Sequence, residues 1–212
     1  QFKNNKYERN FFKFEMDESQ NDWYASFLID KLKEDLSKCQ KPENDSNELE
    51  ESFSRLNYYI DYLPGLTEFE IPDNLKPILN KKILDSAIAK GISNYLDLLA
   101  KQFNASSIKA TTLKDAVSDS IVREIGSEGF LKLKDNYYNN RLAVVLLNDE
   151  MPDKSFRTPT RIIQKYEPVY MKPLSKYGRA HFYAPYKLIG NLPIDTFWFN
   201  LLVLWLVSII LY

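Results

Sequence analysis

The end of the chain constrains its fold most, because the last sixteen residues are almost entirely apolar. Only Asn200 and Ser208 interrupt the apolar run, and no charged residue follows Asp195. At ~1.5 Å per residue, a helix over these residues would be roughly 24 Å long, and one starting at Ile194 roughly 28 Å. The hydrocarbon core of a bilayer is ~30 Å thick. We therefore expect a C-terminal transmembrane helix over 194–212, truncated before any flanking charge.

The alternative for this segment is a helix buried in the core of a soluble protein. Such helices usually keep a polar stripe, whereas here the apolar residues would lie on all sides of the helix. Aromatic side chains also collect where a membrane helix meets water. The candidate membrane-interface residues are Phe197, Trp198, Trp205 and Tyr212.

Composition excludes several other classes of protein. Aromatic residues make up 14% of the 212 residues and glycines number only 6, which excludes collagen-like and wholly disordered chains. Cys39 is the single cysteine, so the chain can form no internal disulfide and no cysteine-rich zinc site. Because the first residue is Gln and the chain stops within an apolar run, we expect an excerpt of a longer polypeptide.

Helical periodicity dominates residues 1 to about 150, where apolar residues recur every three or four positions. Pro64–Gly65 and the stretch Gly126–Gly129 are predicted to break helices. We predict a mainly α fold, a helical domain with a long central helix. The predicted helices cover 22–39, 49–63, 76–104, 112–125 and 127–146.

Residues 151–193 differ from the helical domain because they contain six prolines. Prolines at this density prevent long helices, and the β-branched and aromatic residues between them favour short strands. We predict an extended Pro- and Tyr-rich return segment over 151–193, which leads the helical domain back to the membrane.

Charge is divided along the chain although the net charge is −1. Residues 1–75 carry 9 Lys/Arg and 17 Asp/Glu, and the remainder carries 19 and 12. A basic run interleaved with tyrosines precedes the apolar end. Such a run suits single-stranded nucleic acid, a solvated surface, or lipid headgroups beside a membrane helix. Its position favours headgroups, so we expect no nucleic-acid partner. The candidate juxtamembrane cations are Lys172, Lys176, Arg179 and Lys187.

The chain carries no recognisable catalytic motif, such as a phosphate-binding loop, a zinc-protease motif or a nucleophile elbow. His181 is the only histidine and has no second histidine or cysteine nearby in the sequence with which to share a metal. Cys39 is predicted to be a buried free thiol. We therefore predict no catalytic, cofactor-binding or metal site, and no enzymatic activity in this chain.

The C-terminal part of the chain carries a family resemblance. Residues 121–150 read IVREIGSEGFLKLKDNYYNNRLAVVLLNDE, and residues 154–200 read KSFRTPTRIIQKYEPVYMKPLSKYGRAHFYAPYKLIGNLPIDTFWFN, followed directly by the apolar run. This succession resembles bacterial ATP-binding cassette transporters in which the ATPase and an exporter-type permease share one polypeptide. The resemblance implies that this chain is an extracytoplasmic insert and the membrane helix that follows it.

The resemblance also implies where the protein works. ATP and Mg would bind outside this chain, and the helical domain would lie in the periplasm, attached to the bacterial inner membrane. The juxtamembrane cations lean weakly toward a cytoplasmic body, but that rule is weak for a long domain. The expected partners are the lipid bilayer, other transmembrane helices of the parent protein and an envelope protein. The alternative is a membrane-anchored structural or signalling module that binds a protein partner.

Overall fold

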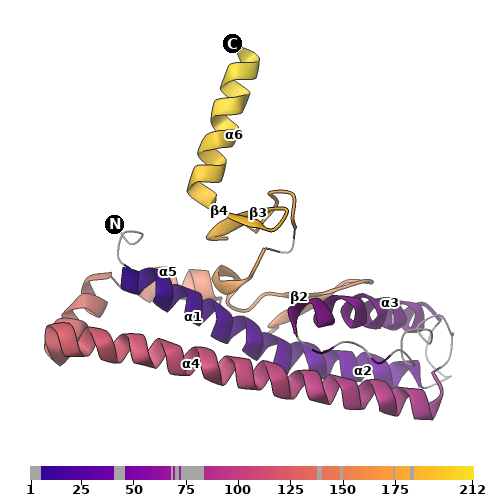
Figure 1. Cartoon of the computed structure of the whole chain (residues 1–212). Coiled ribbons are helices and arrows are strands. Elements are labelled where there is room, and N and C mark those ends of the chain that lie inside the picture. Colours follow the sequence, from indigo (N-terminus) through magenta and orange to yellow (C-terminus); the bar gives the residue numbers. More distant parts are fainter. Residues whose placement is uncertain are drawn as a thin grey trace.

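A layer of long helices forms the body of the molecule, and one further helix projects from it (Figure 1). The computed structural model describes residues 6–40, 46–67, 69, 72, 84–137, 140–148, 150–173, 175–181 and 184–212. The fold is mainly helical, as predicted. The helices are α1 Lys6–Trp23, α2 Ile29–Cys39, α3 Ser46–Tyr62, α4 Ser86–Tyr137, α5 Asn140–Leu147 and α6 Thr196–Leu211, and the strands are β1 Ser155–Arg157, β2 Ile162–Gln164, β3 Tyr186–Ile189 and β4 Leu192–Asp195.

α1 and α2 form one continuous rod, because a π-helical turn over Tyr24–Leu28 joins them with helical backbone at both ends. The helix predicted over 22–39 is confirmed, but the sequence analysis missed α1. Its periodicity is weak because it packs with polar as well as apolar side chains: Ser19 and Gln20 are buried beside Met16 and Trp23.

α3 confirms the helix predicted over 49–63 and begins earlier, at Ser46. It ends as predicted, because Pro64 and Gly65 lie in the short 3-10 turn Leu63–Leu66 that follows it. Its apolar face packs against α2.

α4 is longer than any helix predicted, because it runs through the break expected between residues 104 and 112. Thr112 was predicted to open a new helix. Instead, the hydroxyls of Thr111 and Thr112 donate to the carbonyls of Ser107 and Ile108, one turn back in the same helix, at 3.1 and 2.9 Å. These threonines therefore continue the helix, and that predicted boundary is wrong.

The break predicted at Gly126–Gly129 is confirmed. Gly126 has φ 75° and ψ 165°, a backbone conformation that costs glycine little and other residues much. α4 kinks there, and α5 continues the helical pattern predicted for 127–146. The predicted start of the long helix at residue 76 lies outside the described residues.

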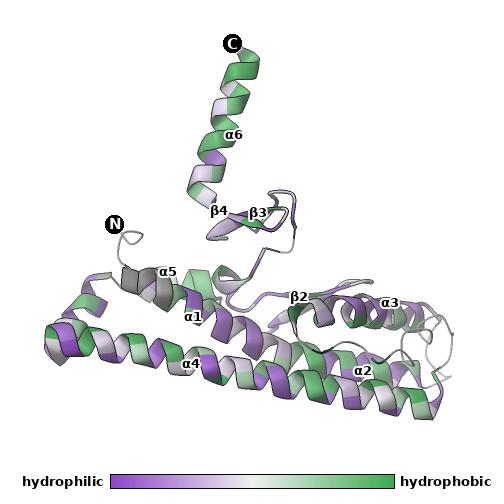
Figure 2. Ribbon diagram, in the orientation of Figure 1, coloured by the Kyte–Doolittle hydropathy of each residue, from purple (hydrophilic) through white to green (hydrophobic). Residues whose placement is uncertain are grey.

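The hydrophobic core lies between α2, α3 and the first half of α4. Burial of an aliphatic side chain stabilises the fold by ~1.5–3 kcal/mol, and this part of the body contains the most fully buried ones. In Figure 2 these helices carry hydrophobic and hydrophilic residues side by side, whereas α6 is hydrophobic along most of its length. The aliphatic side chains with least exposure are Leu28, Ile29, Leu32, Leu56, Leu63, Ile92, Leu96 and Leu99.

The return segment contains the predicted short strands, arranged as two antiparallel hairpins, β1–β2 and β3–β4. β1–β2 lies on the body, where the Tyr59 hydroxyl donates to the carbonyl of Ile162 at 2.7 Å and accepts from its amide at 3.0 Å. β4 extends to Asp195, two residues beyond the predicted end of the segment at 193.

The transmembrane helix expected over 194–212 is not found. Within the ranges that the structure describes, no helix is both long and apolar enough to cross a membrane. α6 has 16 residues, or roughly 24 Å at ~1.5 Å per residue. It starts only at Thr196, because Ile194 and Asp195 pair within the β3–β4 hairpin.

Candidate functional site

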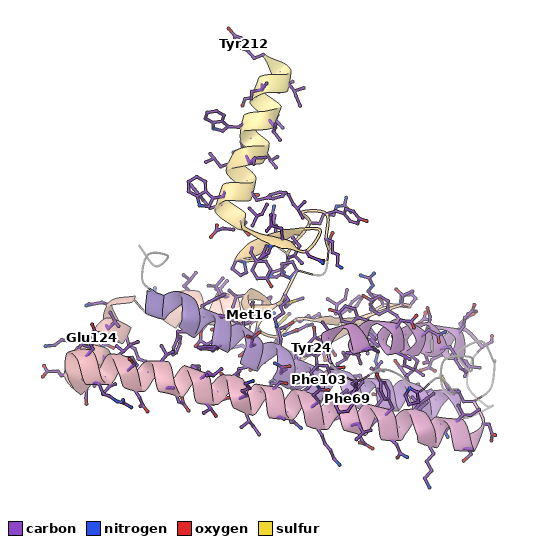
Figure 3. The ribbon with its side chains drawn as sticks, in the orientation of Figure 1. Met16, Tyr24, Phe69, Phe103, Glu124 and Tyr212 are labelled. Atoms are coloured by element: carbon purple, nitrogen blue, oxygen red, sulfur yellow. The ribbon has the colours of Figure 1, made fainter. Side chains whose placement is uncertain are left out.

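α6 exposes apolar side chains around its whole circumference (Figure 3). Every residue from 200 to 212 is exposed. Among the predicted interface residues, Phe197, Trp198 and Trp205 are 60%, 63% and 68% exposed, and Tyr212 is fully exposed. Soluble proteins rarely present an apolar surface of this extent to water, and one that does so marks an interaction site.

The base of α6 is held by a small β structure, which we call the collar: residues 176–179 together with the β3–β4 hairpin. The amide of Gly178 donates to the carbonyl of Leu188 at 2.7 Å, and the amide of Gly190 donates to the carbonyl of Lys176 at 2.8 Å. These bonds hold residues 176–178 against the hairpin and form an isolated antiparallel bridge between Tyr177 and Ile189.

The collar and α6 are joined without a linker, since β4 ends at Asp195 and α6 begins at Thr196. The Asp195 carboxylate caps the helix by accepting from the amide of Phe197 at 2.9 Å. The amide of Thr196 donates to the carbonyl of Pro185 at 3.1 Å, and its hydroxyl donates to that of Ala184. The first turn of α6 is therefore fixed to the segment that precedes β3.

Close packing between Gly178 and Phe199 completes this joint. A Cβ on Gly178 would lie 2.5 Å from Cζ of Phe199, so the ring rests directly on the glycine backbone. Gly178 also has φ +73°, which an L side chain rarely adopts. The collar and the base of α6 thus form one packed unit.

The predicted juxtamembrane cations do not lie together. Lys187 lies against α6, where its Nζ donates to Oδ1 of Asn200 at 2.8 Å and lies 4.6 Å from the centre of the Phe199 ring. Lys176 and Arg179 are exposed on the collar. Lys172 lies on the body, where its Nζ is 2.6 Å from Oδ1 of Asp17 in α1.

The earlier part of the basic run pairs with the acidic first part of the chain. Arg157 donates to both carboxylate oxygens of Glu34, at 3.1 and 2.6 Å, and this guanidinium lowers the pKa of Glu34 to about 2. Lys154 lies 4.4 Å from the centre of the Tyr166 ring, a cation–π contact within the chain. The alternation of basic and aromatic residues therefore stabilises the fold here.

Sequence reasoning missed a buried ion pair between α2 and α3. Arg55 donates through Nε and Nη2 to the two carboxylate oxygens of Asp35, at 2.8 and 3.1 Å, and both side chains are buried. Arg55 also donates to the carbonyl of Thr158 at 3.1 Å. The signal was present, because Asp35 follows Leu32 by three positions and precedes Cys39 by four, on the apolar face of its helix.

Burial disfavours the charged forms of both His181 and Cys39. His181 is half-buried; its Nε2 has no hydrogen-bond partner among the described residues, and burial lowers its pKa. Cys39 is buried as predicted, and burial raises the pKa of its thiol to about 12. In the described ranges, no group of three His, Cys, Asp or Glu side chains could hold a metal ion.

Comparison with models of protein families, with curated proteins and with solved structures gave no match for this chain. The resemblance of residues 121–212 to transporters therefore remains a prediction. The candidate site is therefore an exposed apolar helix fixed to the collar, and its function depends on what covers that helix.

Proposed function

We propose that this chain is the extramembrane domain of a membrane transport protein of the ATP-binding cassette type, and that α6 enters the apolar interior of a bilayer. The observation that carries the membrane attachment is the exposure of apolar side chains on all sides of α6. The transport role is supported by the resemblance of residues 121–212.

Lipid is a suitable surrounding for α6 for two reasons. Removal of apolar surface from water contributes about 25 cal/mol per Å², and almost every side chain of this helix offers such surface. The polar side chains that interrupt it have partners: Asn200 accepts from Lys187, and Ser208 donates to the carbonyl of Leu204 at 2.8 Å. Helical backbone also satisfies its own hydrogen bonds, as a lipid environment requires.

The proposed role of the collar is mechanical coupling. The collar is packed against the base of α6 and continues into it directly, so a tilt or rotation of α6 would carry the collar with it. ATP and Mg would act elsewhere in the parent protein and drive such movements. The domain would lie in the periplasm, beside the bacterial inner membrane, with lipid, neighbouring membrane helices and an envelope protein as partners.

Vesicle flotation tests the membrane attachment. The full chain should float with phosphatidylcholine vesicles, and L202S/W205S/I209S should not. A matched control is I108S/L131S/V145S, which removes three comparably exposed apolar side chains from the body and should still float. The proposal would be overturned if the full chain stayed monomeric in buffer without detergent and did not float with the vesicles.

Thiol labelling tests the periplasmic placement. Lys101 is exposed on α4, so a Lys101→Cys variant expressed in bacterial cells should react with a membrane-impermeant maleimide before lysis. Cys39 stays in place, because its burial keeps it unreactive. Reaction of Lys101→Cys only after lysis would contradict a periplasmic domain.

A further inference from the structure

We infer that the collar is a second membrane contact, selective for anionic phospholipids. In this inference Lys176 and Arg179 bind the phosphate groups, and the exposed apolar row Tyr177, Ile189 and Leu192 enters the interfacial layer. It rests on the proposed attachment of α6 and adds lipid selectivity to it.

The apolar row follows from the register of the collar strands. Tyr177 bridges Ile189, and Ile189 pairs with Leu192 across the β3–β4 turn. Side chains of directly paired residues project from the same face of a sheet, so these three lie side by side. They are 92%, 52% and 63% exposed, although nothing in the hairpin requires apolar residues at exposed positions.

Two cations lie next to Tyr177 and Gly178 in the sequence. Lys176 and Arg179 lie on either side of the Tyr177–Gly178 pair and are exposed. Asp195 is the only acidic residue in the sequence from 176 to 195, and its carboxylate caps α6. The collar is therefore locally basic in a chain whose net charge is −1.

The position of the collar selects lipid as the occupant. It adjoins the residue at which α6 begins, because β4 continues directly into α6 and the Phe199 ring rests on Gly178. If α6 lies in the apolar interior, its first turn lies at the headgroup layer, and the collar lies there too. Apolar side chains beside Lys and Arg are the composition that binds this layer.

Energy transfer tests the selectivity. The full chain is reconstituted in phosphatidylcholine vesicles that contain a trace of pyrene-labelled phosphatidylglycerol or pyrene-labelled phosphatidylcholine, with Trp198 and Trp205 as donors. Since a cation at an anionic surface favours binding about five-fold, transfer to the anionic lipid should clearly exceed transfer to the neutral one. K176Q/R179Q should equalise the two, and K101Q/K109Q, which removes the same charge from exposed positions of α4, should not.

A second measurement tests the apolar row. An environment-sensitive dye on Leu192→Cys should shift to the blue when the chain joins vesicles, whereas the same dye on Leu131→Cys, a body residue of similar exposure, should not. Flotation with equal transfer to both lipids, or no shift at position 192, would overturn this inference and leave the attachment of α6 standing. Failure to float at all would instead overturn the attachment.

Discussion

Arg55 links three parts of the helical body through its buried guanidinium, which bonds to Asp35 of α2, to Glu51 within α3 and to the carbonyl of Thr158 after β1. Replacement of Arg55 by Met would leave the Asp35 carboxylate buried without its countercharge. Loss of one partner from such a pair costs about 3–5 kcal/mol. We expect R55M to lower the free energy of unfolding by this amount, measured by urea denaturation.

The double variant D35L/R55M is the control for this prediction. An apolar pair of similar volume often replaces a buried ion pair without loss of stability, so the double variant should be more stable than R55M. If R55M lowers the free energy of unfolding by less than about 1 kcal/mol, the buried ion pair contributes little to the stability of the α2–α3 packing.

Cys39 is expected to be inert in the folded chain. The thiolate is the reactive form, and a pKa of about 12 leaves almost none of it at neutral pH. A thiol reagent at pH 7.5 should modify Cys39 slowly in buffer and completely in 8 M urea, followed by mass spectrometry. Rapid modification of the folded chain, at a rate close to that of Lys101→Cys, would contradict its burial.

The collar depends on Gly178, and Gly190 provides the comparison. Both have positive φ, +73° and +60°, but only Gly178 has another residue's atoms where a Cβ would lie. The strained backbone costs about 1–2 kcal/mol in either variant, and G178A must also displace the Phe199 ring. We expect faster amide hydrogen exchange at position 178, whose amide donates to the carbonyl of Leu188, and at Thr196 in G178A than in G190A. Equal exchange in the two variants would mean that the ring contact contributes nothing.

The hairpin β1–β2 should loosen from α2 in acid. The pKa of Glu34 is lowered from 4.5 to about 2, chiefly by hydrogen bonds from Arg157. A carboxylate with a lowered pKa stabilises the fold above its unfolded value and loses that contribution as the pH falls toward its folded value. The relevant window is therefore pH 4.5 to 2. Unfolding measured across it should be less pH-dependent in E34Q, and an NMR titration of Glu34 with a midpoint near 4.5 would refute the pairing.

The elements that the sequence predicts well are those whose apolar periodicity is strong and local. The helices over 22–39 and 49–63, the turn at Gly126 and the proline-broken return segment all depend on neighbours within a few positions. α1 escaped because it buries polar side chains such as Gln20, which bonds to Gln164 on β2, far away in the sequence. Thr111 and Thr112 resemble caps in sequence and bond within the helix in the structure.

The candidate site was only partly predictable for the same reason. The apolar character of α6 is plain from composition, and its interface residues are exposed as the sequence suggested. The collar is not visible in the sequence, because it is made by pairing residues 176–178 with β3 and by the packing of Gly178 on Phe199. Both contacts join segments that are separated in the sequence, and no local sequence pattern predicts that they meet.

For the whole molecule, the division of charge along the chain stabilises the fold, because oppositely charged parts pair with each other. Among the described residues, three ion pairs join a carboxylate of the acidic first part to a cation of the basic remainder: Glu18 with Lys114, Asp17 with Lys172 and Glu34 with Arg157. Each partly exposed pair contributes about 0.2–1 kcal/mol and is screened by salt. Unfolding by urea in neutral detergent should therefore become easier by about 1 kcal/mol between 0.05 and 0.5 M NaCl. Unchanged stability would show that these pairs offset only their own desolvation.

In Figure 1 the axis of α6 runs across that of α4, and this orientation would affect how closely copies of the protein can pack in a membrane. α4 extends from Ser86 to its kink at Gly126, about 60 Å at ~1.5 Å per residue, whereas a helix is only about 10 Å wide. With α6 perpendicular to a bilayer, the body would lie along the membrane surface. It would then cover an area several times the cross-section of α6. Neighbouring copies would meet body to body long before their helices could touch, so the body would limit how densely the protein populates a membrane.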